Sequence, residues 1–334
     1  MSSNDTTLPG IADVRQAAGR IAGHAVRTPL LSSQFLDELV GGRVLLKCEN
    51  MQRTGSFKFR GAYNALAALG RETRSRGVVA VSSGHHAQGV AEAARLFGVR
   101  ATIVMPANAP AIKRARTERS GGRIIAYDRA SDNREAIAAG VIAAEGGALI
   151  HPFNDPDVIA GQGTIGLEIA ADCAEAGMHP DMVVVPCGGG GLSSGVGIAI
   201  RDWSAEAELM LVEPVGFDEY ARSLKAGMRV TNPATSGSVC DALLSATPGA
   251  IGFALNRAHG AAAVAVSDAE ALAAVAFAYR ELKQIVEPGG AVALAAVLSG
   301  RIQCRGRVTV AVLSGGNIDD AMLARALASS EGAQ

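Results

Sequence analysis

The 334-residue sequence lacks several features that would assign it to a common functional class. It has 31 Lys and Arg against 32 Asp and Glu, a net charge of −1, and no cluster of basic residues. Proteins that bind nucleic acid need clustered cations opposite the phosphates, so we expect no nucleic-acid partner. The longest apolar runs are too short to cross a bilayer, so we expect no membrane partner either.

Cysteine and aromatic residues are also scarce. The five cysteines show no CxxC spacing, which indicates neither a zinc site nor a disulfide framework. Aromatic residues make up only 4% of the chain. The N-terminal stretch MSSNDTTLPG has neither the basic start nor the apolar segment of a secretory signal. We therefore expect a cytoplasmic protein.

What the sequence does contain is an alternation of short β-rich runs with longer alanine-rich stretches. The strand candidates, all continuously apolar, are 43–48, 78–82, 101–105, 123–127, 182–186, 207–212 and 307–313. The helix candidates are 86–97, 131–145, 157–177, 267–282 and 318–329, and Ser267 with Glu270 forms a capping-box pattern. Continuously apolar strands that alternate with helices predict an α/β fold with parallel sheets buried on both faces. The length predicts two domains, with boundaries near Asn50 and 151–158.

One lysine stands in an unusual position. The stretch TGSFKFRGAYNAL (54–66) places Lys58 between two phenylalanines at the start of a predicted helix. A positive charge there opposes the helix dipole, and apolar neighbours favour the neutral amine. Lys58 is therefore a candidate for a reactive amine, with a solvated surface lysine as the alternative.

Four consecutive glycines follow a predicted strand in VVVPCGGGGLSSG (183–195). Glycine lets the backbone approach an anion closely, and the amides of the following helix point at it. This pattern predicts a phosphate or carboxylate site, with a tight turn as the alternative. Dinucleotide binding is disfavoured because serine replaces the last glycine of GxGxxG.

Two further strand ends carry small polar residues. SSGHH (82–86) precedes a predicted helix and suits a substrate carboxylate, although Ser82 or Ser83 could simply cap that helix. SGGN (314–317) follows the last predicted strand. Since ligands bind at the carboxyl ends of parallel strands, we expect the three loops to share one crevice at the carboxyl edge of a sheet.

These motifs together resemble those of the fold-type II pyridoxal 5′-phosphate enzymes, specifically the serine/threonine dehydratases (ammonia-lyases) and serine racemases. The matching stretches occur in the order of that family: TPL (28–30), KCENMQRTGSFKFRGA (47–62), SSGHHAQG (82–89), HPFNDPDVIAGQGTIGLEI (151–169), CGGGGLSSG (187–195), VEP (212–214), VEPGGAVALAA (286–296) and LSGGNID (313–319). The resemblance implies two open, mostly parallel twisted sheets with helices on both faces, as in the tryptophan synthase β fold. It implies a large cofactor-binding domain of residues 1–50 and 153–334, and a smaller mobile α/β domain of residues 51–152.

The resemblance also implies roles for single residues around the cofactor pyridoxal 5′-phosphate. The residues expected to contact it are Lys58 as Schiff-base partner, Phe57 beside the ring, Gly188, Gly189, Gly190 and Gly191 around the phosphate, and Ser314 at the pyridine nitrogen. Those expected to bind the substrate carboxylate are Ser82, Ser83, Gly84 and His86. Ser314 could alternatively be a turn residue. A serine there leaves the ring a weaker electron sink than a carboxylate would, which favours elimination over transamination.

The implied activity is dehydration and deamination of a β-hydroxy amino acid, of the L-threonine, L-serine or threo-3-hydroxyaspartate type, to a 2-oxo acid and ammonia. Lys58 would remove the α-proton. The alternatives are an amino-acid racemase, in which Ser83 acts as a second acid and base on the opposite face, and a non-catalytic cofactor-binding relative. The resemblance also implies a homodimer.

The sequence departs from the family pattern at two places. His85 replaces the usual asparagine that donates to the cofactor's phenolic oxygen; its imidazole N–H can substitute as donor, and its charge depends on pH. Glu213 and Glu219, with the carbonyl of Phe217, match positions at which racemase-like members bind Mg²⁺ or another divalent cation. Aspartate is common at the second of these carboxylates, so Glu219 is a departure.

Overall fold

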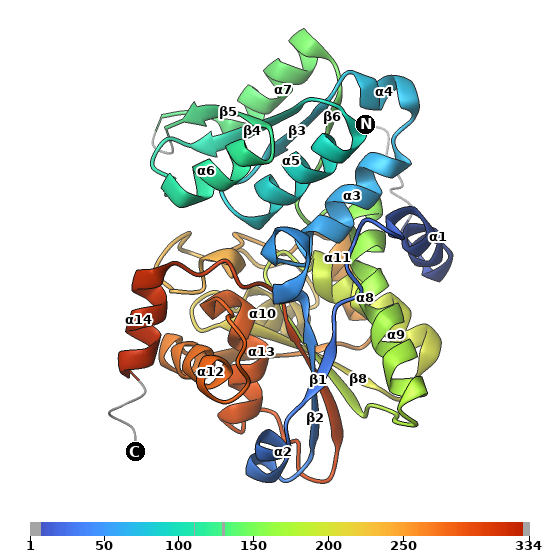
Figure 1. Cartoon of the computed structure of the whole chain (residues 1–334), viewed down its shortest axis with the longest axis vertical. Helices are drawn as coiled ribbons and strands as arrows, with labels where there is room; N and C mark the ends of the chain where they lie inside the picture. Colours follow the sequence, from blue (N-terminus) through green and yellow to red (C-terminus); the bar gives the residue numbers. More distant parts are fainter. Residues whose placement is uncertain (1–7, 110, 129–130, 330–334) are drawn as a thin grey trace.

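The computed structural model describes residues 8–109, 111–128 and 131–329, which form two β-sheets, as Figure 1 shows. The six-stranded sheet has the order β1-β2-β10-β7-β8-β9, and all its pairs are parallel except β1 with β2. Its strands are β1 (Leu30–Ser32), β2 (Arg43–Cys48), β7 (Met182–Pro186), β8 (Glu208–Pro214), β9 (Ala262–Val266) and β10 (Val308–Leu313). The predicted fold class is confirmed.

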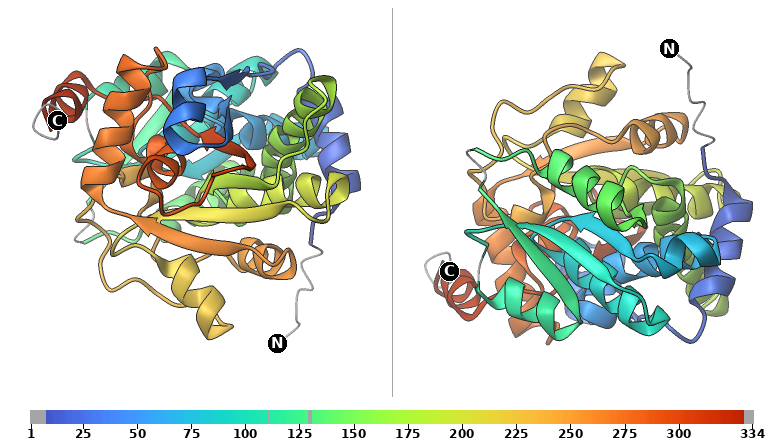
Figure 2. Two further views of the ribbon diagram at one scale, coloured as in Figure 1. Left: turned by 90° about the horizontal axis from the view of Figure 1, so that it is seen from below. Right: turned by 90° about the horizontal axis from the view of Figure 1, so that it is seen from above.

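The second sheet has four strands in the order β5-β4-β3-β6, all parallel. They are β3 (Val78–Val81), β4 (Ala101–Pro106), β5 (Gly122–Tyr127) and β6 (Ala148–Leu149). All four lie between residues 51 and 152, whereas the six strands of the larger sheet lie outside that range. Figure 2 shows the same arrangement from below and from above.

Helices connect most of the strands. They are α1 (Ile11–Ile21), α2 (Gln34–Val40), α3 (Lys58–Ala68), α4 (Arg71–Ser75), α5 (His85–Phe97), α6 (Ala111–Arg119), α7 (Arg134–Glu145), α8 (Pro156–Glu175), α9 (Gly191–Trp203), α10 (Glu219–Ala226), α11 (Ala250–Ala258), α12 (Asp268–Arg280), α13 (Pro288–Leu298) and α14 (Asp320–Ser329), with short 3-10 turns η1 (Glu49–Met51), η2 (Arg53–Gly55) and η3 (Asp241–Leu243). Among the described residues, no helix is both long and apolar enough to span a membrane.

The predicted elements are confirmed with small shifts of their ends. Each of the seven predicted strands and five predicted helices is present, and the predicted capping box of Ser267 and Glu270 begins α12. The largest shift is at α7, which begins at Arg134 because the Asn133 side chain accepts a hydrogen bond from the amide of Ala136. Short elements such as β1, β6 and α4 carry too few residues to show a period, and the sequence did not indicate them.

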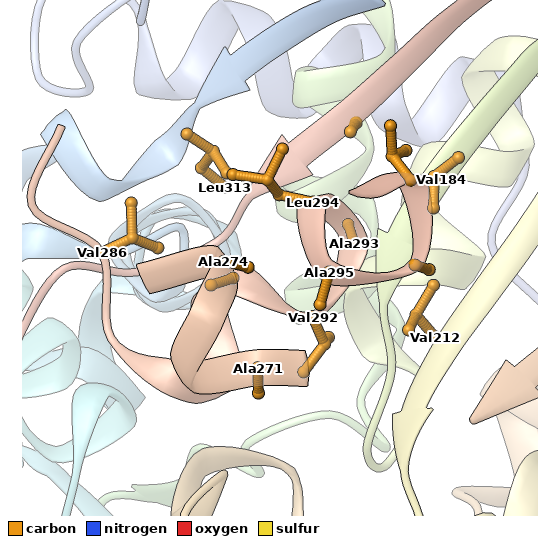
Figure 3. Packing of buried hydrophobic residues seen from close by; sticks show 14 of the residues in the cluster. Val184, Val212, Ala271, Ala274, Val286, Val292, Ala293, Leu294, Ala295 and Leu313 are labelled. Carbon is orange, nitrogen blue, oxygen red and sulfur yellow. The ribbon is translucent and has the colours of Figure 1, made fainter. Parts of the chain in front are cut away.

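Alternation along the strands divides the core of the larger sheet between its two faces. Val184, Val212 and Leu313 pack against α12 and α13, and Figure 3 shows them with Val292 and Leu294 of α13. Neighbouring strand residues, such as Val183 and Val185, point to the other face and pack with residues of α8 and α9. Period-two burial on both faces explains why these strands are continuously apolar.

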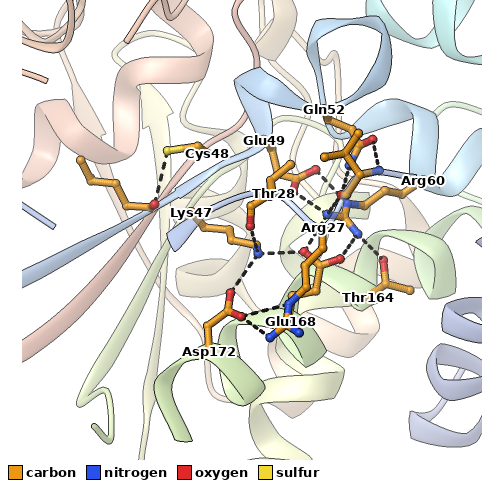
Figure 4. A network of polar contacts seen from close by, with 12 residues as sticks. Arg27, Thr28, Lys47, Cys48, Glu49, Gln52, Arg60, Thr164, Glu168 and Asp172 are labelled. Atoms are coloured by element: carbon orange, nitrogen blue, oxygen red, sulfur yellow. Dashed lines mark hydrogen bonds and ion pairs between the residues drawn. The ribbon is translucent and has the colours of Figure 1, made fainter. Parts of the chain in front are cut away.

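A buried polar network fixes the start of α3 against α8, as Figure 4 shows. The Arg60 guanidinium donates to both carboxylate oxygens of Glu49, each at 2.8 Å, and to Glu168 at 2.7 and 2.9 Å. Lys47, which is fully buried, pairs with Glu168 at 2.7 Å and Asp172 at 3.3 Å. Because Arg60 follows Lys58 by two residues, this network sets the position of Lys58.

Candidate active site

A cavity of about 220 Å³ lies where loops of both sheets meet. It is lined by the loops after β3, β7 and β10 and by the start of α3. The expectation of a crevice at the edge of one sheet is therefore corrected, because β3 belongs to the smaller sheet and β7 and β10 to the larger. The cavity brings together every residue predicted to bind cofactor or substrate: Phe57, Lys58, Ser82, Ser83, Gly84, His85, His86, Gly188, Gly189, Gly190, Gly191 and Ser314.

Lys58 begins α3 and projects into the cavity. Its ammonium donates to the carbonyl of Pro152 at 2.7 Å and lies 5.1 Å from the centroid of the Phe57 ring. Burial lowers the pKa of Lys58 from 10.5 to about 8, because the low-dielectric surroundings disfavour the charged form. A neutral amine, which can bind a carbonyl or accept a proton, is thus accessible near neutral pH.

The glycine run has no room for side chains. Gly190 has a φ of +89°, and a Cβ there would lie 1.7 Å from the Tyr220 hydroxyl. A Cβ on Gly189 or Gly191 would lie 2.4 or 2.9 Å from atoms of Phe153. Gly191 begins α9, so the unpaired amides of the first turn lie at the cavity wall. This arrangement suits a phosphate group.

The loop after β3 leads into α5. The alternative that Ser82 or Ser83 caps this helix is wrong, since the N-cap is Gly84 and no side chain caps it. The Ser82 hydroxyl instead accepts from the amide of Gly84 at 3.2 Å. The first amides of α5 are therefore left for a ligand, and a carboxylate suits the positive end of the helix dipole.

The side chain of His86 is already hydrogen-bonded within the protein. Its Nε2 lies 2.8 Å from the carbonyl of Ile150, and burial lowers the pKa of His86 to about 3. The neutral ring donates through Nε2, so Nδ1, which is buried without a partner, carries only a lone pair. A lone pair does not attract a carboxylate. The group of His86 that can bind the substrate carboxylate is its backbone amide.

Ser314 and His85 complete the cavity wall. The carbonyl of Ser314 accepts from the amide of Phe57 at 3.2 Å, which ties the end of β10 to the residue before Lys58. His85 Nε2 lies 3.0 Å from a carboxylate oxygen of Glu287, the N-cap residue of α13. Both side chains of this pair are nearly buried and line the cavity.

The three residues predicted to bind a cation lie outside the cavity. Glu213 accepts hydrogen bonds from the amides of Tyr220 and Ala221 at 2.7 and 2.9 Å and so holds the start of α10. Glu219 accepts from Asn232 at 2.6 Å, while its other oxygen is buried without a partner. Burial raises the pKa of Glu213 to about 8 and that of Glu219 to about 7. Phe217 is buried in the turn between them. No cluster of three or more metal-binding side chains occurs in the described part of the chain.

Several cavity residues were not predicted as site residues. Phe153 and Glu287 stand in the stretches HPFNDPDV and VEPGGA that carry the family resemblance, so those motifs could have indicated them. Lys113 of α6 and Asp241 of η3, whose side chains pair at 2.5 Å at the cavity wall, look like ordinary surface charges in the sequence. Only the fold brings them together.

The matches to known proteins agree with this geometry. Residues 21–315 match the family model described as pyridoxal-phosphate dependent enzyme, and the chain belongs to that family. It is an enzyme of the fold-type II class, as predicted from its motifs.

Individual relatives narrow the comparison. The chain is 41% identical over 94% of its length to an L-threonine ammonia-lyase of Thermotoga maritima, covering 77% of that protein. It is also 41% identical, over 93% of its length, to an L-threo-3-hydroxyaspartate ammonia-lyase of a Pseudomonas species, covering 96% of it. Maize serine racemase has a similar structure, with a TM-score of 0.90, 36% identity and coverage of 98% of this chain and 99% of that one.

The cavity residues fit pyridoxal 5′-phosphate. The glycine run lines the cavity with backbone that can approach a phosphate, and a Cβ on Gly189, Gly190 or Gly191 would clash with Phe153 or Tyr220. Lys58 provides an amine of lowered pKa for the aldehyde. Ser314, at the end of β10, provides a hydroxyl on the same cavity.

Proposed function

We propose that this enzyme is an ammonia-lyase that dehydrates and deaminates a β-hydroxy amino acid of the threonine, serine or threo-3-hydroxyaspartate type. The observation that carries the proposal is the Lys58 amine, buried enough to be neutral near pH 8, beside a glycine-lined anion site and a free helix N-terminus. The two relatives at 41% identity are both named as ammonia-lyases of such substrates.

Each part of the cavity then has one task. The bound cofactor supplies an electron sink for the bond that breaks at the substrate α-carbon. The amides of the glycine run hold the phosphate, and the first amides of α5 hold the substrate carboxylate. Lys58 Nζ accepts the α-proton, which requires the neutral amine. Phe57, against which Lys58 packs, keeps water from that nitrogen.

Racemisation is the second candidate function. Ser83 lines the cavity and carries a hydroxyl that can exchange a proton, and the structural similarity to maize serine racemase supports this candidate. The substrate must then lie between Ser83 and Lys58. Serine racemisation with little 2-oxo acid release would favour it over the lyase.

The deciding experiment measures 2-oxo acid release by the cofactor-loaded protein from L- and D-β-hydroxy amino acids. We expect release from at least one L-substrate and its loss in Lys58→Ala. Lys225→Ala, which changes an exposed lysine at the end of α10, is the matched control and keeps full activity. No release from any substrate would overturn the lyase proposal.

We also propose that a divalent cation binds at Glu213, Glu219 and the Phe217 carbonyl. The partnerless buried oxygen of Glu219 supports this, since a cation would satisfy it. Mg²⁺, Mn²⁺ or Ca²⁺ should then raise the melting temperature, and Glu219→Gln should remove the effect. A melting temperature that stays the same with all three ions would contradict the cation.

We further propose that the protein is a homodimer and that it is located in the cytoplasm. Exposed apolar side chains support a dimer: Phe35 stacks on Phe277 of α12, and Tyr279, Ile285 and Met51 are exposed on the same or adjoining segments. Light scattering on the purified protein should give twice the mass of the 34.0 kDa chain. Fractionation of the cells that make the protein tests its location.

A further inference from the structure

The contact between His85 and Glu287 joins, at the cavity, the part of the molecule around the four-stranded sheet to the part around the six-stranded sheet. His85 is the first residue of α5, which packs on the smaller sheet, and Glu287 precedes α13, which packs on the larger sheet. The pair lies on Gly315, where a Cβ would lie 2.8 Å from His85 Cε1 and 2.9 Å from Glu287 Oε1. Only glycine at position 315 leaves room for both side chains, so the pair is closely packed beside Ser314.

The contact limits where the imidazole can carry its proton. A carboxylate only accepts hydrogen bonds, so the 3.0 Å ion-pair contact with Glu287 favours a proton on His85 Nε2. A neutral imidazole has one N–H, which leaves Nδ1 with a lone pair. His85 lines the cavity, and within the described residues its Nδ1 makes no hydrogen bond to the protein, so this nitrogen is available to a ligand there.

We propose that Glu287 is a positioning residue that keeps the His85 proton on Nε2, so that Nδ1 is the nitrogen offered to the bound cofactor. This rests on the proposed function and refines the role of His85. An asparagine amide at this position donates at every pH. His85 donates into the cavity only as the imidazolium and accepts there when it is neutral.

Other charged groups surround this nitrogen and belong to the argument. The titratable side chains that line the same cavity are Lys58 of α3, His86 of α5, Lys113 of α6 and Asp241 of η3. Lys113 and Asp241 form an ion pair with each other, and His86 is hydrogen-bonded to the carbonyl of Ile150. The group that contacts His85 directly is Glu287, which makes it the residue to change.

The test is ¹⁵N NMR of the imidazoles in the cofactor-loaded protein and in the cofactor-free protein. The chain has only six histidines, and His85→Asn identifies the His85 signals. We expect the Nε2–H tautomer of His85 to be at least about tenfold more populated than the Nδ1–H tautomer, because a hydrogen bond to a charged acceptor supplies that much free energy. His86 serves as an internal reference, since its Nε2 lies 2.8 Å from the carbonyl of Ile150 and donates to it.

Glu287→Gln supplies the decisive comparison. The Glu287 side chain makes no capping bond at α13, so this variant keeps the helix start. Its amide both donates and accepts, and the tautomer preference should fall several-fold. The cofactor absorbance of Glu287→Gln should also differ from wild type, while in a His85→Asn background the same change should have no effect.

Two results would overturn the proposal: Nδ1–H as the main tautomer in the wild type, or an unchanged tautomer ratio in Glu287→Gln. Neither depends on turnover. A protein that releases no 2-oxo acid but shows the Nε2–H tautomer refutes the proposed function and leaves the pair intact. Release of 2-oxo acid together with the opposite tautomer refutes only the proposed role of Glu287 and leaves the proposed function standing.

Discussion

At the scale of single residues, burial decides the chemistry of the site. Lys58 and His86 lie within one cavity, and burial lowers the pKa of both, to about 8 and about 3. For Lys58 this gives a usable base. For His86 it removes the positive charge that would attract a carboxylate, and the backbone amides of α5 are left for that role. The residue types were evident from the sequence, but the surroundings that set their charge were not.

The lowered pKa of Lys58 predicts a pH-dependent stability in the cofactor-free protein. Since the pKa falls from 10.5 in the unfolded chain to about 8 in the folded one, the unfolded state binds more protons between these values. The contribution of Lys58 to the free energy of unfolding is therefore largest above pH 10.5 and is lost as the pH falls to about 8, a difference of roughly 3 kcal/mol. Urea unfolding at pH 7 and pH 9.5 measures it. Lys58→Met cannot titrate, so its free energy of unfolding should rise less between the two pH values than that of the wild type. Equal rises in the two proteins would contradict the lowered pKa.

Gly190 should be intolerant of any side chain. Gly190→Ala places a Cβ 1.7 Å from the Tyr220 hydroxyl at a φ of +89°, so we expect cofactor binding to be lost and stability to fall by about 3 kcal/mol or more. Gly140→Ala is the matched control, because this glycine lies inside α7 with open space around it. There the helix propensity of alanine should stabilise the protein by up to about 1 kcal/mol. Thermal unfolding and cofactor absorbance measure both variants.

At the scale of elements, the buried ion network holds α3 against α8 and against the segment after β2. Arg60→Met leaves the buried carboxylate of Glu49 with the Thr28 hydroxyl but without its charged partner, and we expect a loss of about 3–5 kcal/mol. Arg301→Ala breaks the partly exposed pair with Glu270 and should change stability by less than about 1 kcal/mol. Chemical denaturation distinguishes the two. Similar small losses in both would show that the network contributes little to the position of Lys58.

At the scale of the whole molecule, the site is formed only where the two sheets face each other. Besides the buried contacts of Arg60 with Glu168, polar pairs at the cavity join the two sides: Lys113 with Asp241, Arg116 with Asn317 at 3.0 Å, and His85 with Glu287. The partly exposed pair of Lys113 with Asp241 contributes little stability of its own.

Lys113→Ala tests this arrangement. Removing the pair with Asp241 should change the free energy of unfolding by less than about 1 kcal/mol, because both side chains are partly exposed. We expect KM for the amino acid to rise severalfold, with a smaller change in kcat, because the closed cavity becomes less populated. Steady-state kinetics measure it, and Asp241→Asn should have a similar effect. An unchanged KM in both variants would show that the pair does not assist closure.

The sequence by itself determined seven of the strands, several of the long helices, the unusual position of Lys58 and the glycine run. These depend on local patterns: continuous apolar runs, a capping box at Ser267, and residue types that a short motif specifies. The family resemblance added the roles of residues such as Ser314, which no local pattern gives.

Only the tertiary structure decided how the loops combine. Ser82 to His86 and Gly188 to Gly191 lie on different sheets, and nothing in their own sequences states that the sheets face each other. The pairing of His85 with Glu287, more than two hundred residues apart, likewise depends on where α5 and α13 pack. Charge state, tautomer and free helix amides all follow from burial and neighbours, which a chain acquires only when it folds.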